Sequence, residues 1–201
     1  MPRIARVVCR GCAALALSGA SLSAQAVKSH SSGFFVGLGL EGTGISTKPS
    51  GRTATIESGN GGGLELGYGF GPRWALYGDV SGAGVNGEGD DRYLLTHVDV
   101  GARVHFRAGP NRVVPFIQLG LAGRDEREDV SGHTVSANGG GVSLGAGLHA
   151  HFTPTFAFSG SIIGVVGNFN NSHIDNESVS DASTSATSVR VHLGLVWFPG
   201  A

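Results

Sequence analysis

The sequence predicts an all-β protein in which eight antiparallel strands form an up-and-down β-barrel. Two segments, 61–76 and 139–158, are alternating runs that each bend at an aromatic residue, Gly or Thr, and Pro, as two β-hairpins would. Apolar residues alternate with small or polar ones in both runs, because successive strand side chains point to opposite faces. Composition adds a third observation: 35 residues are Gly and only 14% are charged, against about a quarter in soluble domains.

The first 26 residues have the features of a cleaved secretory signal. Three arginines precede an apolar run, and Ala24-Gln25-Ala26 has the small-x-small pattern of a cleavage site. We therefore expect residues 27–201 to form one domain, the barrel. Cys9 and Cys12 both lie in the signal, so their C-x-x-C spacing is not a redox or metal motif of the mature protein. Removing the three signal arginines from 14 basic residues leaves a formal charge of −4, which argues against nucleic acid as a partner.

Eight runs with strand periodicity follow the signal. The clearest alternation runs from Leu94 to Phe106, and the least regular is near the paired residues Ile162 and Ile163. Periodicity places the strands at about 33–41, 61–70, 74–81, 94–106, 113–122, 139–152, 156–166 and 188–197.

The connections between these strands alternate in length. Short turns follow the second, fourth and sixth strands, on the side of both termini of the mature chain. Long polar loops, at about 42–60, 82–93, 124–138 and 167–187, lie at the opposite end. This asymmetry is typical of transmembrane β-barrels, with short periplasmic turns and four longer extracellular loops.

Barrel size indicates which face of each strand is outside. Eight strands leave an interior just wide enough for side chains, and the apolar face is too bulky to fit there. The opposite face is largely Gly, Ala and Ser with a few long polar groups, which suits a narrow lumen. At the turn end we expect aromatic residues to form a girdle at the lipid interface, namely Phe70, Trp74, Phe106, Phe152, Phe156 and Trp197.

Four motifs give the chain a family resemblance: F-G-P-R-W after a Gly-rich strand, T-H-V-D-V-G-A-R-V-H-F, P-F-I-Q-L-G-L and the closing V-H-L-G-L-V-W-F. The chain resembles the eight-stranded outer-membrane barrels related to the transmembrane domain of outer membrane protein A, outer membrane protein X and the opacity-type surface antigens. The resemblance implies location in the outer membrane of a Gram-negative-type bacterium. In that family the last strand usually ends at a C-terminal aromatic residue, whereas here Phe198 is followed by three more residues.

The resemblance also implies partners. They are outer-membrane lipid and lipopolysaccharide, the outer-membrane assembly machinery, and an extracellular partner that the loops would contact.

Long polar side chains on the inner face predict a hydrogen-bonded interior. Charges at membrane depth should pair, and scattered inward histidines more often fill a polar interior than bind metal. We therefore expect no metal and no cofactor, and a network that closes the lumen. Its predicted members are Glu65, Asp79, His97, Asp99, Arg103, His105, His149, His151, Arg190 and His192.

These features support three hypotheses for function. The first is a non-enzymatic barrel with a small, largely closed lumen, whose loops serve envelope stability or surface interaction. The second is a narrow pore for small or apolar solutes. The third is a lipid-modifying barrel enzyme, for which only His133 and Ser172-His173 offer candidate residues near the outer leaflet.

Overall fold

The computed structural model describes most of the chain that follows the predicted signal. The described residues are 31–48, 55–87, 92–106, 112–130, 133–174, 177–180 and 184–199. The signal peptide and its cleavage site lie outside them. Within these ranges no helix is long and apolar enough to cross a bilayer.

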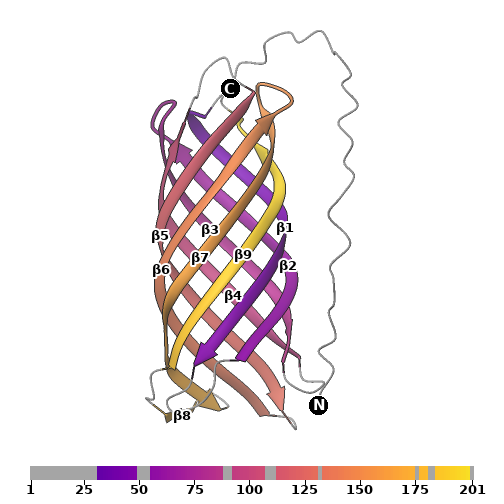
Figure 1. The fold of residues 1–201 in the computed structure, drawn as a ribbon, viewed down its shortest axis with the longest axis vertical. Helices are drawn as coiled ribbons and strands as arrows, with labels where there is room; N and C mark the ends of the chain where they lie inside the picture. Colours follow the sequence, from indigo (N-terminus) through magenta and orange to yellow (C-terminus); the bar gives the residue numbers. More distant parts are fainter. Residues whose placement is uncertain are drawn as a thin grey trace, which may run out of the picture.

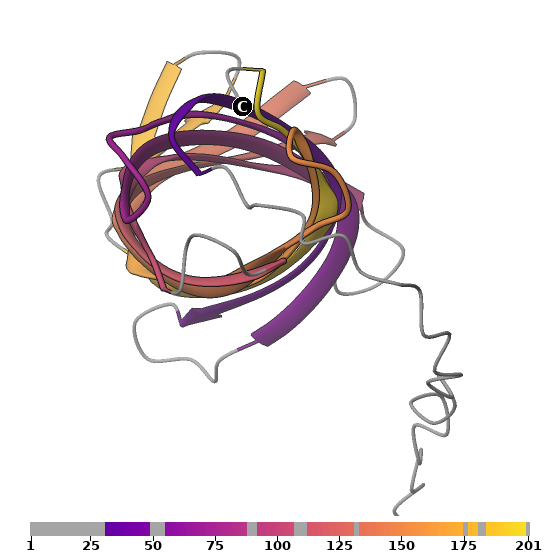
Figure 2. The ribbon, with the colours of Figure 1, turned by 90° about the horizontal axis from the view of Figure 1, so that it is seen from above.

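The described residues form nine β-strands, of which eight make a closed ring (Figures 1 and 2). The ninth, β8, is a four-residue strand that pairs with β7 beyond the ring. The strands are β1 Gly33–Lys48, β2 Thr55–Gly69, β3 Trp74–Asn86, β4 Arg92–His105, β5 Val113–Val130, β6 His133–His151, β7 Phe156–Ile174, β8 Glu177–Ser180 and β9 Thr184–Trp197.

Each barrel strand pairs antiparallel with its neighbours in the chain, and β9 closes the ring. β9 pairs with β7 on one side and with β1 on the other, where Val36 lies opposite Trp197. A closed ring leaves no unpaired strand edge, which is the condition for a β-structure in hydrocarbon. The predicted eight-stranded up-and-down barrel is confirmed.

The strands run further than the hydrophobic pattern predicted. β5 and β6 cover residues 113–130 and 133–151, so most of the predicted loop at 124–138 is strand, and the other three loops are shortened in the same way. Backbone pairing continues beyond the apolar band, where the outward residues are mostly small or polar and apolar residues such as Ile45 and Val85 face inward, so an outward apolar pattern no longer marks a strand. The predicted loop boundaries were therefore wrong: much of what extends at this end is paired strand, and only residues 131–132 separate β5 from β6.

We call the end that carries Phe198 and the short turns the turn end, and the opposite one the loop end (Figure 1, top and bottom). In the first turn Phe70 N–H donates to the Trp74 carbonyl at 2.7 Å. Gly71 has φ of 98° there, which favours glycine. At the chain end, Phe198 N–H donates to the Thr155 carbonyl at 2.7 Å and so ties β9 to the turn between β6 and β7.

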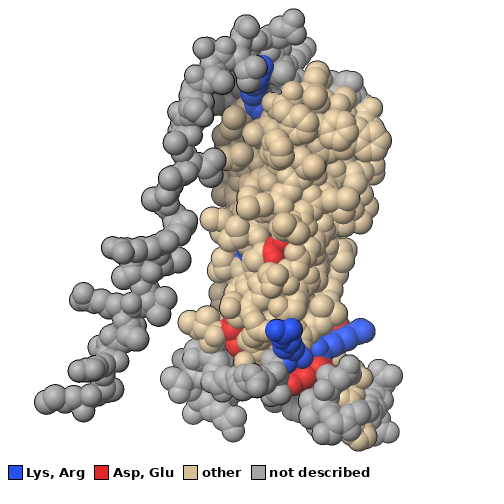
Figure 3. All heavy atoms as spheres, turned by 90° about the vertical axis from the view of Figure 1, so that its right-hand side faces the viewer, with Lys and Arg blue, Asp and Glu red and all other residues tan. Residues whose placement is uncertain are grey.

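The outer wall is apolar over most of its height, as predicted. Side chains such as Val100, at 57% exposure, face outward. β7 also alternates at the adjacent isoleucines, where the sequence pattern was least regular: Ile162 faces outward and Ile163 is buried. In Figure 3 the wall of the barrel is almost entirely uncharged, with only a small charged spot midway, and most of the charged atoms gather near the loop end.

Candidate functional site

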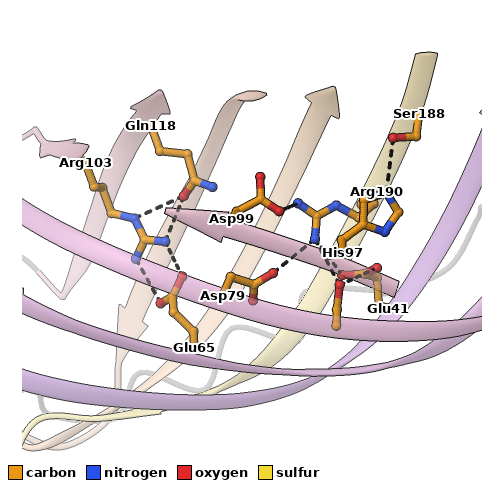
Figure 4. Close-up of polar contacts among 10 residues, drawn as sticks. Glu41, Glu65, Asp79, His97, Asp99, Arg103, Gln118, Ser188 and Arg190 are labelled. Atoms are coloured by element: carbon orange, nitrogen blue, oxygen red, sulfur yellow. Dashed lines mark hydrogen bonds and ion pairs between the residues drawn. The ribbon is translucent and has the colours of Figure 1, made fainter. Parts of the chain in front are cut away.

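The barrel interior is where the structure brings the predicted polar residues together. All ten predicted members of the network lie on the inner face of the strands, and nine of them are buried, while Glu65 is partly buried. They do not form one cluster. Figure 4 shows two separate groups of ion pairs, each built around one arginine.

Arg190 of β9 is the centre of the first group and has no exposed surface. Its Nη2 lies 2.5 Å from Asp99 Oδ2, and its Nη1 lies 3.0 Å from Asp79 Oδ1. Glu41 Oε2 is 3.5 Å from Nη1, and Ser81 joins both, because it accepts from Arg190 and donates to Glu41 at 3.0 Å. One guanidinium therefore connects β9 with β1, β3 and β4 through the lumen.

Arg103 of β4 is the centre of the second group, nearer the turn end. Its Nη1 donates to Glu65 Oε1 at 3.0 Å, and its Nη2 pairs with the other oxygen of the same carboxylate. Gln118 accepts from Nε at 3.1 Å and from Nη2 at 2.8 Å. The guanidinium also lies 4.1 Å from the Phe116 ring centroid and 5.1 Å from that of Tyr77, which favours the buried cation.

Aromatic and histidine rings fill the turn end of the lumen. Phe198 is buried and lies 5.7 Å from Phe35 and 5.3 Å from His151, measured between ring centroids. The ring of Phe35 lies against Gly67, where an added Cβ would come within 2.2 Å of Phe35 Cζ. The inner face therefore carries large aromatic rings as well as the predicted Gly, Ala and Ser. These rings fit because glycines on the neighbouring wall leave room for them.

A second apolar layer fills the loop end of the lumen. This loop-end layer consists of Ile45, Val85, Tyr93, Leu95, Phe169 and Ala186, all buried together. The sequence prediction missed it because most of these residues fall within segments that were predicted to be loops.

Glu41, Gln118 and Arg124 are long polar side chains that are buried in the interior but were absent from the predicted network. Glu41 and Gln118 belong to the two groups above, and both had been placed on the inner face. Arg124 had been placed in a loop, yet it is buried, donates to the Ala186 carbonyl at 3.2 Å and lies 5.1 Å from the Phe169 ring. Counting inward positions along β5 past Ala122 would have found it, because every second residue faces the lumen.

Little space remains around the ion pairs. A cavity of about 10 Å³ is lined by residues of both arginine groups, among them Glu41, Glu65, Asp79 and Asp99, and this is room for about one water molecule. In the described part of the chain no group of three or more His, Cys, Asp or Glu is arranged to hold a metal ion.

The residues considered for a lipid-modifying enzyme do not form a described site. His133 is exposed at the start of β6, and Ser172 and His173 lie in β7 rather than in a loop. The side-chain positions of Ser172 and His173 fall outside the description. The predicted girdle aromatics all point outward at the turn end, each with more than a third of its surface exposed: Phe70, Trp74, Phe106, Phe152, Phe156 and Trp197.

Carboxylates gather on the inner wall of the loop end, outside the membrane-spanning part. The Tyr93 hydroxyl donates to Glu57 Oε2 at 2.5 Å. Burial, together with the nearby Glu57 and Glu128 carboxylates, raises the pKa of Glu126 to about 7. Burial and the bond to Glu57 also raise the pKa of Tyr93.

The comparison with protein families identifies the architecture. The model of the family described as outer membrane protein beta-barrel domain matches residues 12–195. The chain belongs to this family. As an outer membrane protein β-barrel domain, it lies in the outer membrane of a Gram-negative-type cell.

Solved structures of other outer-membrane proteins have the same fold. Neisserial surface protein A is 14% identical, with a TM-score of 0.64 over 83% of this chain and 97% of that one. OprG of Pseudomonas aeruginosa is 16% identical, with a TM-score of 0.59 over 85% and 98%. Ail, the attachment invasion locus protein of Yersinia pestis, is 17% identical, with a TM-score of 0.51 over 83% and 99%. No curated protein matches the chain.

We predict that Arg190→Met strongly destabilises the folded barrel. The substitution leaves Asp79, Asp99 and Glu41 buried without their cation, and breaking a buried ion pair in this way costs about 3–5 kcal/mol. The matched control is Arg127→Met, which breaks an exposed pair with Asp125 and should cost less than about 1 kcal/mol. Denaturant unfolding of both variants in lipid vesicles measures the difference, and equal effects would contradict the central role of Arg190.

We predict a pH-dependent effect of Glu126→Gln. The folded state holds the Glu126 proton up to about pH 7, above the ordinary value of 4.5. The stability that this proton provides is therefore complete below the ordinary value and is lost as pH rises through about 7. Glu126→Gln should raise the free energy of unfolding at about pH 8 and change it little at about pH 5. The same gain at both pH values, in denaturant titrations, would rule out the proton as its cause.

Proposed function

We propose that this protein is a non-enzymatic outer-membrane barrel with a closed lumen, which holds its loop end rigidly at the cell surface for surface interaction or envelope stability. The observation that carries the proposal is the filled interior. Between the Phe198 ring at one end and the loop-end layer at the other, two buried arginines are each paired with carboxylates. This arrangement supports a structural interior rather than a path for solutes.

Closure by three layers in series is the physical basis for a non-conducting lumen. An ion that crossed would have to displace the Phe198 and Phe35 rings, separate Arg190 from its three carboxylates, and then enter the loop-end layer. Separating a buried ion pair exposes unpaired charge to a medium of low dielectric, which costs several kcal/mol. Each layer alone therefore opposes permeation.

The extended strands support a role for the loop end. β5 and β6 continue as a paired hairpin up to Val130 and His133, beyond the outward apolar residues of the wall. Backbone hydrogen bonds fix this extension more firmly than a free loop would be fixed. It offers an ordered surface outside the membrane for a partner to contact.

We predict that the folded mature chain, residues 27–201, gives no steady openings in a planar lipid bilayer. The Arg103→Ala and Asp99→Ala variants should also show no channel openings. Each substitution removes one ion-pairing side chain and leaves the Phe198 and Phe35 rings and the loop-end layer in place. A heat-dependent gel shift serves as the folding control for each protein. Steady openings of the unmodified barrel, changed in amplitude by either substitution, would make the narrow pore the leading function.

We predict that lipid A from cells that express the protein keeps its mass. No catalytic arrangement supports a lipid-modifying activity within the described residues, and His133 and His173 are the candidates to test. Mass spectrometry of lipid A would compare cells with the unmodified protein and cells with His133→Ala/His173→Ala. A modified lipid A that disappears with these two substitutions would establish an enzyme.

A further inference from the structure

Two arginines stand on the outer wall of the barrel near the loop end. Arg92 lies at the start of β4, and Arg127 lies in the extended part of β5, where its side chain is 65% exposed. Both alternate with inner-wall residues, since Tyr93 and Glu126 face the lumen. Both arginines are therefore directed toward the surrounding membrane, away from the Glu57, Glu126 and Glu128 carboxylates on the inner wall of the loop end.

Strand register makes these two arginines neighbours. Arg127 lies directly opposite Leu94, and Arg92 is two residues from Leu94 on the same face of β4. Diagonal positions of this kind are about 7–8 Å apart, within reach of long side chains. Both guanidinium groups can therefore contact one ligand, with the exposed Leu94 side chain between them.

Their height on the wall corresponds to lipid headgroups. Outward residues of β4 run from Phe106 through Val100 and Val98 to Thr96, then Leu94 and Arg92. Each residue of a strand tilted by about 40° adds about 2.5 Å along the barrel axis. An apolar band about 25 Å tall that begins at Phe106 thus ends near Thr96, which places Arg92 about 10 Å above it.

The other described side chains that point outward at this height carry no positive charge. They are small or uncharged: Gly44, Ser46, Ile56, Ser58, Asn60, Gly84, Asn86, Ser136, Asn138, Asn168, Ser185 and Thr187. Asp125 pairs with Arg127 at 2.7 Å, so the trio of Arg92, Arg127 and Asp125 retains one net positive charge. Among the described side chains at this level, positive charge is concentrated at a single place.

We propose that Arg92 and Arg127 form a binding site for the phosphorylated headgroup of an outer-leaflet glycolipid, that is, a phosphate of lipid A. Guanidinium groups present paired N–H donors that match phosphate oxygens. Leu94 lies beside the headgroup at the upper edge of the apolar band. The site is on the lipid side of the wall, so it does not depend on whether the lumen conducts.

A soluble sulfated polysaccharide offers similar anionic chemistry from the extracellular side. The outward direction of both side chains and their height just above the apolar band favour the membrane lipid. The experiment therefore compares the two ligands directly.

The test titrates the folded mature chain in detergent and EDTA with purified bis-phosphorylated lipid A, and native mass spectrometry counts the bound lipid. Arg92→Gln/Arg127→Gln should weaken binding about tenfold, because each arginine near a membrane surface contributes to attraction for anionic lipid. The matched control, Arg73→Gln/Arg112→Gln, removes two exposed arginines at the turn end and should leave binding unchanged. Asp125→Asn should tighten binding about threefold, because it frees Arg127 from its carboxylate.

Three results would overturn the proposal. One is equal weakening by the two double variants, which would indicate attraction to net charge alone. Another is undiminished binding of dephosphorylated lipid A by the unmodified barrel. The third is binding of a sulfated oligosaccharide as tight as that of lipid A and equally dependent on Arg92, which would assign the site to a soluble polyanion.

Discussion

The narrow bore of an eight-stranded barrel is the constraint on which the rest of this structure depends. An interior just wide enough for side chains forces residues from opposite walls into contact, so a buried charge must find its partner across the lumen. Arg190 meets this condition with Asp79, a residue 111 positions earlier in the chain, and with Asp99 and Glu41. The same contacts join the last strand to the first, third and fourth, which supports closure of the ring.

The glycine content follows from the same constraint. Large rings inside a narrow barrel need wall positions without a side chain, and Phe35 and Phe116 lie against Gly67 and Gly147, where an added Cβ would clash with the ring. These glycines serve close packing rather than flexibility. They also allow the Phe116 ring to lie 4.1 Å from Arg103, so the packing of the wall and the solvation of a buried cation are linked.

Alternation in the sequence was enough to predict the barrel and to place the ten polar side chains on the inner face, because within the bilayer one face of each strand must be apolar. The partners of each charge could not be read in this way, since they depend on register across the lumen. Arg124 and the loop-end layer were missed for another reason. Above the membrane the outward residues are mostly small or polar and the apolar residues face inward, so an outward apolar pattern no longer indicates where backbone pairing stops, and the sequence prediction placed the inward residues there in loops.

A filled interior also determines where this chain can differ from other barrels of its family. Inner residues such as Arg190 and Glu41 are constrained by one another, since changing one leaves the others with unpaired charge. Outward residues in the apolar band are constrained only to be apolar. Positions above the band meet neither condition, and there the described outward side chains are mostly Gly, Ser and Asn, with charge at Arg92, Arg127 and Asp125. A charged pair at the one level where charge is not required for folding is therefore better explained by a ligand than by stability.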